Sequence, residues 1–467
     1  MAYFGYVIKI ENLRKHPNAD RLQLLGVFGT ETCVSLDTKV GDIGIYFPCD
    51  GQLSAEFCEA NNLVRKKDDA GNNVGGFLDP DKRNVRAIKL RGERSDGIYL
   101  PISCLESFGD ITTLNIGDRI DVFNGHDICC KYIPRTNKRS YTGGKVNKTR
   151  KHEAPVAPLF KEHADTEQLA YNLSAFRPGD EIEITLKMHG TSQRTGYLPT
   201  LKGYKRTLLD RILRREGTPI YDWGYVSGTR RVVLDNYDGG FYGSNEFREQ
   251  HSKFFEGKLW KGETVYYEVV GFTNTGVPIM HDCDNKKLND EDFIKQYGET
   301  TVFSYGCTPD GMKELYGKDE EGPFNLECAV PRSDIYVYRM TMTNEDGDVV
   351  EYTPNFMRYR CEQMGVKCVP LMWKGTIPQN PATAEDDTVS AGEWVRKVAE
   401  QYYDGPDPIG KTHVREGVVV RILNRPKFSA YKTKNYSFKV LEDIIKDSAD
   451  APDIEEAQEV LEVEDNV

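Results

Sequence analysis

The sequence predicts an α+β protein of two domains, in which a small β-barrel precedes a larger mixed α/β domain. Its 467 residues exceed what one ordinary hydrophobic core organises. Hydrophobic residues make up 39% of the chain and aromatic residues 11%, which is enough apolar material for two cores. Near residue 156 the pattern changes, because short strand-like runs give way to strands that alternate with helix candidates.

Residues 1–127 consist of short β-rich runs separated by Gly, Asn and Asp clusters. The runs are YFGYVIKI, RLQLLGVF, DIGIYFP, VRAIKL and DGIYLPI. About five such strands suit a small barrel of the oligonucleotide-binding (OB) type. HPNADRLQ resembles the opening of the tRNA-binding barrels attached to some synthetases, and it also suits a Pro-Asn turn that enters a second strand. We therefore predict an OB-type nucleic-acid-binding domain.

The net charge of −12 argues against a generic nucleic-acid binder, but the charge is segregated. From Lys131 to Lys151 there are eight Lys and Arg and no acidic residue. From Asp447 to Val467 there are nine acidic residues and no basic one, and without them the charge is near −3. We predict a disordered acidic tail at 447–467 and a basic linker at 128–155. The linker is either a solvated connector or a strap that binds RNA phosphates through Lys145, Lys148, Arg150 and Lys151.

The cellular location is predicted from cysteines and apolar runs. Eleven cysteines without a CxxC pair suit a reducing compartment. The sequence has no apolar h-region at its N-terminus and no apolar run of membrane-spanning length. We expect an intracellular, cytoplasmic protein (or a phage protein in the host cytoplasm) that has no membrane partner.

In the second half, several strand-like runs contain charged residues that a plain strand would exclude. In YKTKNYSF two lysines alternate, so in a strand they point to the same face. Singly, such residues are typical of solvated strand ends. Together they suggest one shared polar cavity, because buried charges need partners. The charged residues are Lys187, Glu268, Arg339, Glu416, Lys432 and Lys434.

The residue types in this cavity indicate phosphate chemistry. Carboxylates at strand positions can hold a divalent cation, and lysines and arginines can bind phosphates. A lysine must lose its proton to act as a nucleophile, and neighbouring cations favour that loss. We therefore predict that a lysine attacks a metal-bound nucleotide phosphate to form a phosphoramidate.

The run from Lys187 to Ser192, KMHGTS, resembles the first motif of the covalent nucleotidyltransferases. This superfamily comprises the ATP-dependent DNA and RNA ligases and the mRNA capping enzymes, and its signature is Lys-x-Asp-Gly. Histidine at position 189, followed by Gly-Thr, resembles the RNA ligase 2 group. An N-terminal barrel ahead of this domain resembles the layout of the Naegleria-type RNA ligases.

Further segments resemble the later motifs of the superfamily, in the expected order. They are SGTRR at 227–231, YEVVG at 267–271, YVYR at 336–339, EGVVV at 416–420 and KTKN at 432–435. The resemblance implies a nucleotidyltransferase domain of ATP-grasp-like ligase type at 156–446. Its implied nucleotide site contains the nucleophile Lys187 with Leu186, His189, Gly190, Arg230, Glu268, Tyr338, Glu416, Lys432 and Lys434.

The resemblance also implies individual roles. Arg230 or Arg231 addresses the ribose, and Tyr338 or Tyr336 stacks under the base. Lys432 and Lys434 contact the AMP phosphate and act as catalytic residues beside the nucleophile. Glu416 and Glu268 hold Mg²⁺ or Mn²⁺. Apart from the resemblance, His163, ahead of the nucleophile strand, either faces the nucleotide or, as we expect, lies on a helix surface.

The implied function is ATP-dependent ligation of RNA ends that carry a 3′-hydroxyl and a 5′-phosphate, as at a nick in a duplex. ATP first gives a covalent lysyl-AMP, AMP then passes to the RNA 5′-phosphate, and the 3′-hydroxyl finally displaces it. A DNA ligase or a GTP-dependent capping-type enzyme would use the same lysine chemistry. A non-catalytic OB-fold RNA-binding protein is the alternative from another class. No obligate protein partner is indicated.

Overall fold

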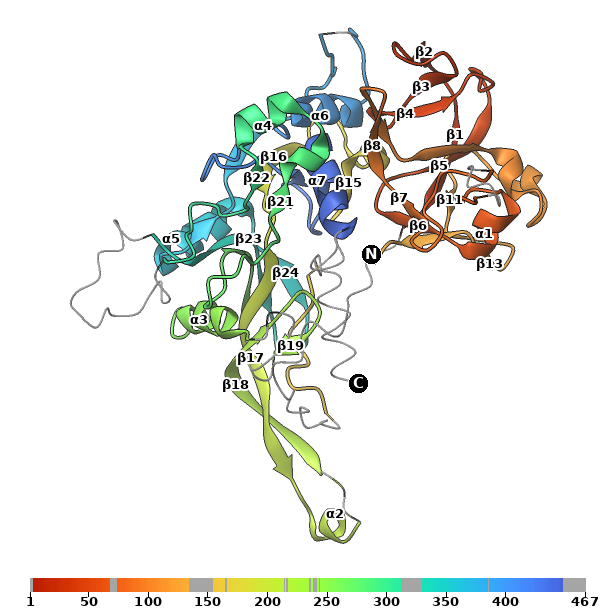
Figure 1. Cartoon of the computed structure of the whole chain (residues 1–467). Helices are drawn as coiled ribbons and strands as arrows, with labels where there is room; N and C mark the ends of the chain where they lie inside the picture. Colours follow the sequence, from red (N-terminus) through yellow and green to blue (C-terminus); the bar gives the residue numbers. More distant parts are fainter. Residues whose placement is uncertain are drawn as a thin grey trace. The chain divides into compact units, whose positions relative to one another are not determined.

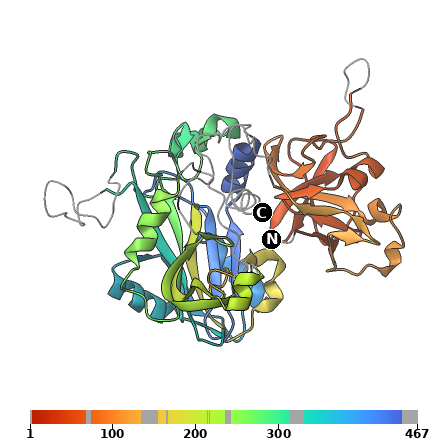
Figure 2. The same cartoon turned by 90° about the horizontal axis from the view of Figure 1, so that it is seen from below.

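The computed structural model describes residues 3–67, 74–133, 154–163, 166–213, 215, 217–234, 237, 242, 244–311, 330–384 and 386–447. The chain forms two compact units, Met1–Ile133 and Pro134–Val467, which are drawn in Figures 1 and 2. The predicted RNA-binding residues of the linker, and the acidic tail from residue 448 on, lie outside the described residues. Among the helices described, none has both the length and the apolar character needed to cross a membrane.

The first unit is built from short antiparallel strands, which pair as β10-β5-β1-β11, β2-β3-β4, β14-β6-β7, β8-β9 and β12-β13. The described strands form these separate sheets and do not close into one barrel, so the OB-type barrel stays a prediction. The strands are β1 (Gly5–Lys9), β2 (Leu13–Lys15), β3 (Leu22–Val27), β4 (Thr30–Ser35), β5 (Ile43–Phe47), β6 (Gly51–Leu53), β7 (Asn84–Val85), β8 (Ala87–Leu90), β9 (Glu93–Asp96), β10 (Ile98–Pro101), β11 (Arg119–Ile120), β12 (Val122–Phe123), β13 (His126–Asp127) and β14 (Cys129–Lys131).

The β10-β5-β1-β11 sheet has an apolar cluster on each face, because both sets of alternating side chains in β1 and β5 are apolar. Ile45 and Phe47 point to one cluster, and Tyr46 to the other. Helix α1 (Ala55–Ala60) begins at Ser54, whose hydroxyl accepts a hydrogen bond from the Phe57 N–H. Strand β14, at the start of the predicted linker, pairs with β6, so residues 128–133 belong to the first unit.

The second unit contains two large mixed sheets. One has the order β15-β28-β27-β16-β26, and the other β19-β18-β17-β20-β23-β24 with β25 paired to β23. Two short strands, β21 and β22, pair separately. The strands are β15 (Glu167–Gln168), β16 (Glu181–Lys187), β17 (Thr191–Lys205), β18 (Thr218–Gly228), β19 (Val233–Leu234), β20 (Glu263–Gly271), β21 (Cys283–Asp284), β22 (Thr300–Thr301), β23 (Ser333–Thr343), β24 (Val349–Glu351), β25 (Lys367–Cys368), β26 (Leu371–Thr376), β27 (Gly417–Ile422) and β28 (Ala430–Lys434).

The longer helices of this unit lie outside the sheets, as Figure 2 shows. Ser390 and Glu393 have the spacing of a capping box, and the Ser390 hydroxyl accepts a hydrogen bond from the Glu393 N–H in the first turn of α6. Helix α5 begins with a proline in its first turn and ends at Gly365, whose φ of 72° suits a helix C-terminus. The helices are α3 (Glu246–Phe254), α4 (Glu291–Tyr297), α5 (Pro354–Met364), α6 (Ala391–Glu400) and α7 (Tyr436–Asp447).

The run KRTLLDRILRR at 205–215 is amphipathic and basic, which predicts a helix, but the helix in the structure is shorter. Helix α2 spans only Leu208–Ile212, at the tip of the hairpin formed by β17 and β18, which projects from the unit in Figure 1. Its apolar side chains, including Leu208 and Ile212, are exposed because no other described element packs against the tip. The amphipathic pattern therefore predicted the helix without showing that its apolar face lacks a core.

Strand β16 positions the site because its two faces differ. Ile182 and Ile184 pack into a core with α6, whereas Glu183, Thr185 and Lys187 alternate onto the opposite face. After Lys187 the chain turns through residues 188–190 and enters β17, which belongs to the other sheet. The nucleophile candidate thus stands where the chain crosses from one sheet to the other.

Candidate active site

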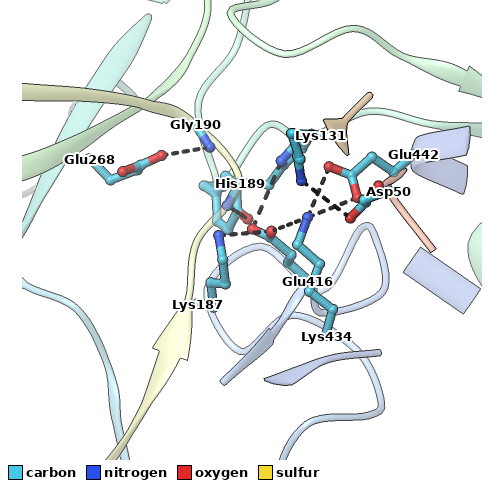
Figure 3. A network of polar contacts seen from close by, with 10 residues as sticks. Asp50, Lys131, Lys187, His189, Gly190, Glu268, Glu416, Lys434 and Glu442 are labelled. Carbon is cyan, nitrogen blue, oxygen red and sulfur yellow. Dashed lines mark hydrogen bonds and ion pairs between the residues drawn. The ribbon is translucent and has the colours of Figure 1, made fainter. Parts of the chain in front are cut away.

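Lys187 and Glu416 form the centre of the site on neighbouring strands. Lys187 pairs in register with Gly417 at the start of β27, which brings Glu416 beside it. The Lys187 Nζ lies 2.8 Å from Glu416 Oε1 (Figure 3). The Lys187 side chain is 24% exposed and that of Glu416 only 2%. Lys187 can therefore contact a bound molecule while the carboxylate that holds it stays buried.

Lys434 adds a second ammonium group to the same carboxylate. Its Nζ lies 3.4 Å from Glu416 Oε1 and 2.8 Å from a carboxylate oxygen of Glu442 on α7. Gly417 permits this close approach, because a Cβ at position 417 would lie 2.8 Å from the Lys434 Cα. Burial alone would raise the pKa of Glu416, but Lys187 and Lys434 outweigh it and lower that pKa below its usual value. Glu416 is therefore ionised at neutral pH.

His189 sits behind this carboxylate in an aromatic pocket. Its ring contacts those of Phe303 and Phe438 edge-on, with centroids 4.6 and 4.8 Å away. Burial lowers the pKa of His189 to about 4, although Glu416 opposes the shift, so the ring is neutral at pH 7. Its Nδ1 lies 3.8 Å from Glu416 Oε2, which is too far for a hydrogen bond. The backbone N–H of His189 donates to the Tyr305 hydroxyl at 2.7 Å, which fixes the backbone close to Lys187.

Gly190 and Glu268 join the two sheets at this corner. The Gly190 N–H donates to Glu268 Oε1 at 3.1 Å. A Cβ at position 190 would lie 2.8 Å from the Val270 side chain and 2.9 Å from that of Glu268, so only glycine fits without displacement. In Figure 3, Glu268 lies on the far side of Gly190 from Glu416. The two predicted metal-binding carboxylates therefore do not form one cluster.

The structure separates the two tyrosines that the sequence left as alternatives. Tyr336 is 5% exposed and packs in the main apolar core. Tyr338 is half-buried, and its hydroxyl lies 2.8 Å from that of Ser192 on β17. Its ring contacts His163 edge-on at 5.0 Å. Of the two, Tyr338 is the one placed to meet a ligand.

His163 lies in a loop and not on the helix surface that we expected. The Arg339 guanidinium donates to its Nδ1 at 3.3 Å, so that nitrogen accepts and Nε2 carries the ring proton. Burial and nearby cations lower the pKa of His163 well below its usual value. These cations are Arg339, Arg230, Arg194 and Lys432. Cations that lie together beside aromatic rings are a setting that can bind an anionic nucleotide.

The remaining predicted residues have distinct positions. Arg230 is 9% exposed and lies near His163, whereas Arg231 is exposed, so the geometry favours Arg230 for the ribose. Lys432 and Lys434 lie on one face of β28, as the alternation predicts. The Leu186 side chain packs in the core, and its N–H donates to the Pro370 carbonyl at 2.9 Å. The Leu186 side chain and N–H are therefore not available to a ligand.

Glu416 is the residue of this site best suited to bind a metal ion. Its Oε2 is buried and accepts no hydrogen bond from the described part of the chain. Such an orphaned oxygen suits a hard divalent cation. The described residues contain no group of three or more His, Cys, Asp and Glu side chains that could hold a metal. The site therefore suits a divalent cation that takes most of its ligands from nucleotide phosphates and water.

Sequence reasoning missed several residues of the site. Glu442 and Tyr305 hold Lys434 and the His189 backbone, and Arg194 lies near His163. Arg194 had a detectable signal, since it alternates with Ser192 in β17 and so shares its face. Glu442 and Tyr305 had none, because each belongs to a segment that looks like ordinary helix or loop.

Comparisons with known proteins identify the fold in which this site lies. No family model matches the sequence, and no curated protein matches it. A structure of a Naegleria gruberi RNA ligase mutant with AMP and Mn aligns with 94% of this chain and 99% of its own, with a TM-score of 0.51 and 14% identity. An apo mutant of that ligase aligns with 94% and 97% of the two chains, with a TM-score of 0.51 and 15% identity. The same ligase with PPi aligns with 93% and 97%, with a TM-score of 0.50 and 16% identity. The chain thus shares the fold of this RNA ligase over nearly its whole length, as the sequence motifs predict.

Proposed function

We propose that this protein is an ATP-dependent RNA ligase that joins 3′-hydroxyl and 5′-phosphate ends through a covalent lysyl-AMP. The observation that carries the proposal is the Lys187 amine, 2.8 Å from a buried carboxylate, with Lys434 on the same oxygen. Its support is the fold shared with an RNA ligase whose structures include complexes with AMP and Mn.

In the first step the Lys187 amine attacks the α-phosphorus of ATP. An N–P bond forms, the bond from the α-phosphorus to the bridging oxygen breaks, and pyrophosphate leaves with the bonding electrons. The ammonium proton must leave for solvent before the attack, since only the free amine is a nucleophile. Glu416 orients Nζ, so positioning supplies much of the rate.

The other residues act on charge and orientation. Lys432 and Lys434 lie on one strand face, where they can neutralise the nucleotide phosphates. Tyr338 and Arg230 lie beside His163, where they can address the base and the ribose. When bound, a divalent cation at Glu416 would neutralise phosphate charge and compete with Lys187 for the carboxylate.

The later steps transfer AMP to the RNA and then release it. The RNA 5′-phosphate attacks the lysyl-AMP phosphorus, so the N–P bond breaks and a phosphate anhydride forms. The 3′-hydroxyl then attacks the RNA phosphorus, loses its proton, and displaces AMP. We propose that the first unit and the linker hold the RNA ends, on the grounds of the linker charge and the fold analogy.

Labelled nucleotides test the proposal. The protein is incubated with α-labelled ATP or GTP and run on a denaturing gel. We expect ATP label on wild type, none on Lys187→Ala, and no GTP label on either. RNA binding should survive in Lys187→Ala. An undiminished adduct in this variant would refute the mechanism, and label from GTP would favour a capping-type enzyme. A panel of nicked substrates with RNA or DNA on each side then separates RNA from DNA ligation.

A further inference from the structure

The Arg248 side chain of α3 is buried in the second unit although it is charged. Its residue surface is 1% exposed. Among the described residues, its guanidinium donates only to the Ser192 carbonyl at 3.1 Å and to the Thr191 hydroxyl at 2.6 Å, and its Nε is left without a partner. Both acceptors are neutral, as is the Phe247 ring that it faces at 5.3 Å. Burial of a cation without an opposite charge is unfavourable, so packing alone does not explain an arginine here.

Arg248 and the nucleotide pocket lie on opposite faces of β17. Side chains alternate along a strand, so Gln193 and Ser192 point to different faces. The Gln193 side-chain amide donates to the Arg248 carbonyl at 2.8 Å, which identifies its face as the one that packs on α3. On the other face, the Ser192 hydroxyl lies 2.8 Å from the hydroxyl of Tyr338. Arg248 therefore holds the strand from behind the pocket.

The two bonds from Arg248 determine where the Ser192 hydroxyl lies. A guanidinium is a rigid fork, so holding the Thr191 hydroxyl and the Ser192 carbonyl together fixes this segment of β17. Tyr338 stands on β23, and β20 separates β23 from β17 in the sheet. Its ring therefore reaches across β20, and its hydroxyl meets Ser192 at the far end. The orientation of the Tyr338 ring thus depends on the position of β17.

We propose that Arg248 is a positioning residue for nucleotide binding, which holds Ser192 so that its hydroxyl keeps the Tyr338 ring in the orientation that stacks on the base of ATP. Arg248 touches no bound molecule in this scheme and acts only through Ser192 and Tyr338. The inference rests on the proposed function, because it adds a residue to the same site. Side chains that are locked by neighbouring hydrogen bonds bind a ligand with less loss of conformational freedom.

A double-mutant cycle on ATP affinity tests the route from Arg248 to Tyr338. ATP is titrated into full-length Lys187→Ala protein, so that no covalent adduct forms. Tyr338→Ala should weaken binding about fivefold or more, as expected for the loss of one stacked base. Arg248→Met should weaken it at least about twofold, the smaller effect of a lost hydrogen bond. Arg248→Met combined with Tyr338→Ala should bind within about twofold of Tyr338→Ala alone, because the two residues act in series.

Arg360→Met is the matched control for loss of a buried arginine. Arg360 is 3% exposed and bonds the Glu263 carboxylate at 2.7 and 2.8 Å. Its removal leaves a buried carboxylate without that partner, whereas Arg248→Met removes a cation that has no carboxylate. Tm should therefore fall more in Arg360→Met, although its ATP affinity should match that of the parent protein. If Arg248→Met does not fold, Arg248→Lys enters the same cycle, because one ammonium group does not reproduce the fork, and at least a twofold loss is again expected.

With Lys187 restored, Arg248→Met should raise the KM for ATP in lysyl-AMP formation and leave kcat per folded molecule near that of wild type. Unchanged ATP affinity in the folded Arg248 variant, additive losses in the double variant, or an equal loss in Arg360→Met would each overturn the positioning role. The titration needs no covalent adduct, so it tests this role even if wild type forms no lysyl-AMP, a result that would refute the proposed function alone. An adduct that forms with an unchanged KM in Arg248→Met would refute the positioning role alone.

Discussion

Replacing Glu416 by glutamine tests the centre of the site. Glutamine keeps the shape of the side chain but removes the charge beside two ammonium groups, at 2.8 Å and 3.4 Å. Removing one partner of a buried ion pair costs about 3–5 kcal/mol. Lys187 is 24% exposed and Lys434 keeps Glu442, so we expect the lower value, about 3 kcal/mol, and a fall in Tm of roughly 4 °C.

The pH dependence of this loss has a defined sign. The folded-state pKa of Glu416 lies below its ordinary value of 4.5. Its contribution to the free energy of unfolding is therefore fully present above pH 4.5 and is lost as pH falls through the folded pKa. The difference in stability between wild type and Glu416→Gln should shrink in that acidic window. Urea denaturation at a series of pH values measures it.

The functional readout is the rate of lysyl-AMP formation per folded molecule, measured with labelled ATP below the Tm of each variant. We expect Glu416→Gln to lose about 100-fold, the size of loss seen when one preorganised polar group is removed. Glu263→Gln is the control. The Glu263 carboxylate is fully buried on β20, bonded to Arg360 at 2.7 and 2.8 Å and to the Tyr352 hydroxyl at 2.9 Å.

Glu263→Gln should lower the free energy of unfolding at least as much as Glu416→Gln, yet leave the rate in folded molecules unchanged. The reasoning is refuted if Glu416→Gln keeps the wild-type rate. It is also refuted if folded Glu263→Gln loses the rate equally, since the effect would then be general destabilisation.

Three further predictions follow from other parts of the structure. Tyr338→Ala should weaken ATP binding about fivefold or more and Tyr338→Phe much less, as measured by titration of the Lys187→Ala protein; equal losses would argue against stacking. The pKa of His189 is about 4 in the folded protein against 6.5 in the unfolded chain, so its contribution to stability is fully present above pH 6.5 and is lost as pH falls through 4. His189→Gln should therefore reduce the change in unfolding free energy across that window by about 3 kcal/mol. An unchanged dependence on pH would contradict the assignment. Neutralising the basic linker should reduce the slope of log affinity for RNA against log salt by up to about 3, and an unaltered slope would remove the linker from the interface; the positions are Lys145, Lys148, Arg150 and Lys151.

Much of the site was predictable because strand periodicity fixes which side chains share a face. The alternation of Lys432 and Lys434 was enough to place both on one side of β28. The sequence predicted only that Lys187 and Glu416 share one polar cavity, because no local rule joins two strands so distant in sequence. The contact required the sheet order, which the structure supplies.

Other features were beyond sequence reasoning for physical reasons. His163 was expected on a helix surface, but its contacts with Tyr338 and Arg339 decide its environment. The separation of Glu268 from Glu416 depends on how the two sheets meet, which no single-strand pattern encodes. The number of short strands in the first unit predicted a β-rich unit, whereas barrel closure depends on register between sheets.

The late position of β27 in the chain has a consequence for synthesis and quality control. Lys187 is made early, but its carboxylate and its neighbouring lysine arrive only with residues 416–434, close to the end of the second unit. A nascent chain, or one clipped before that segment, would hold the proposed nucleophile without the groups that position it. If the proposed lysyl-AMP forms, its appearance would therefore report that β27 and β28 have been made and have paired, and an incomplete molecule would not consume ATP.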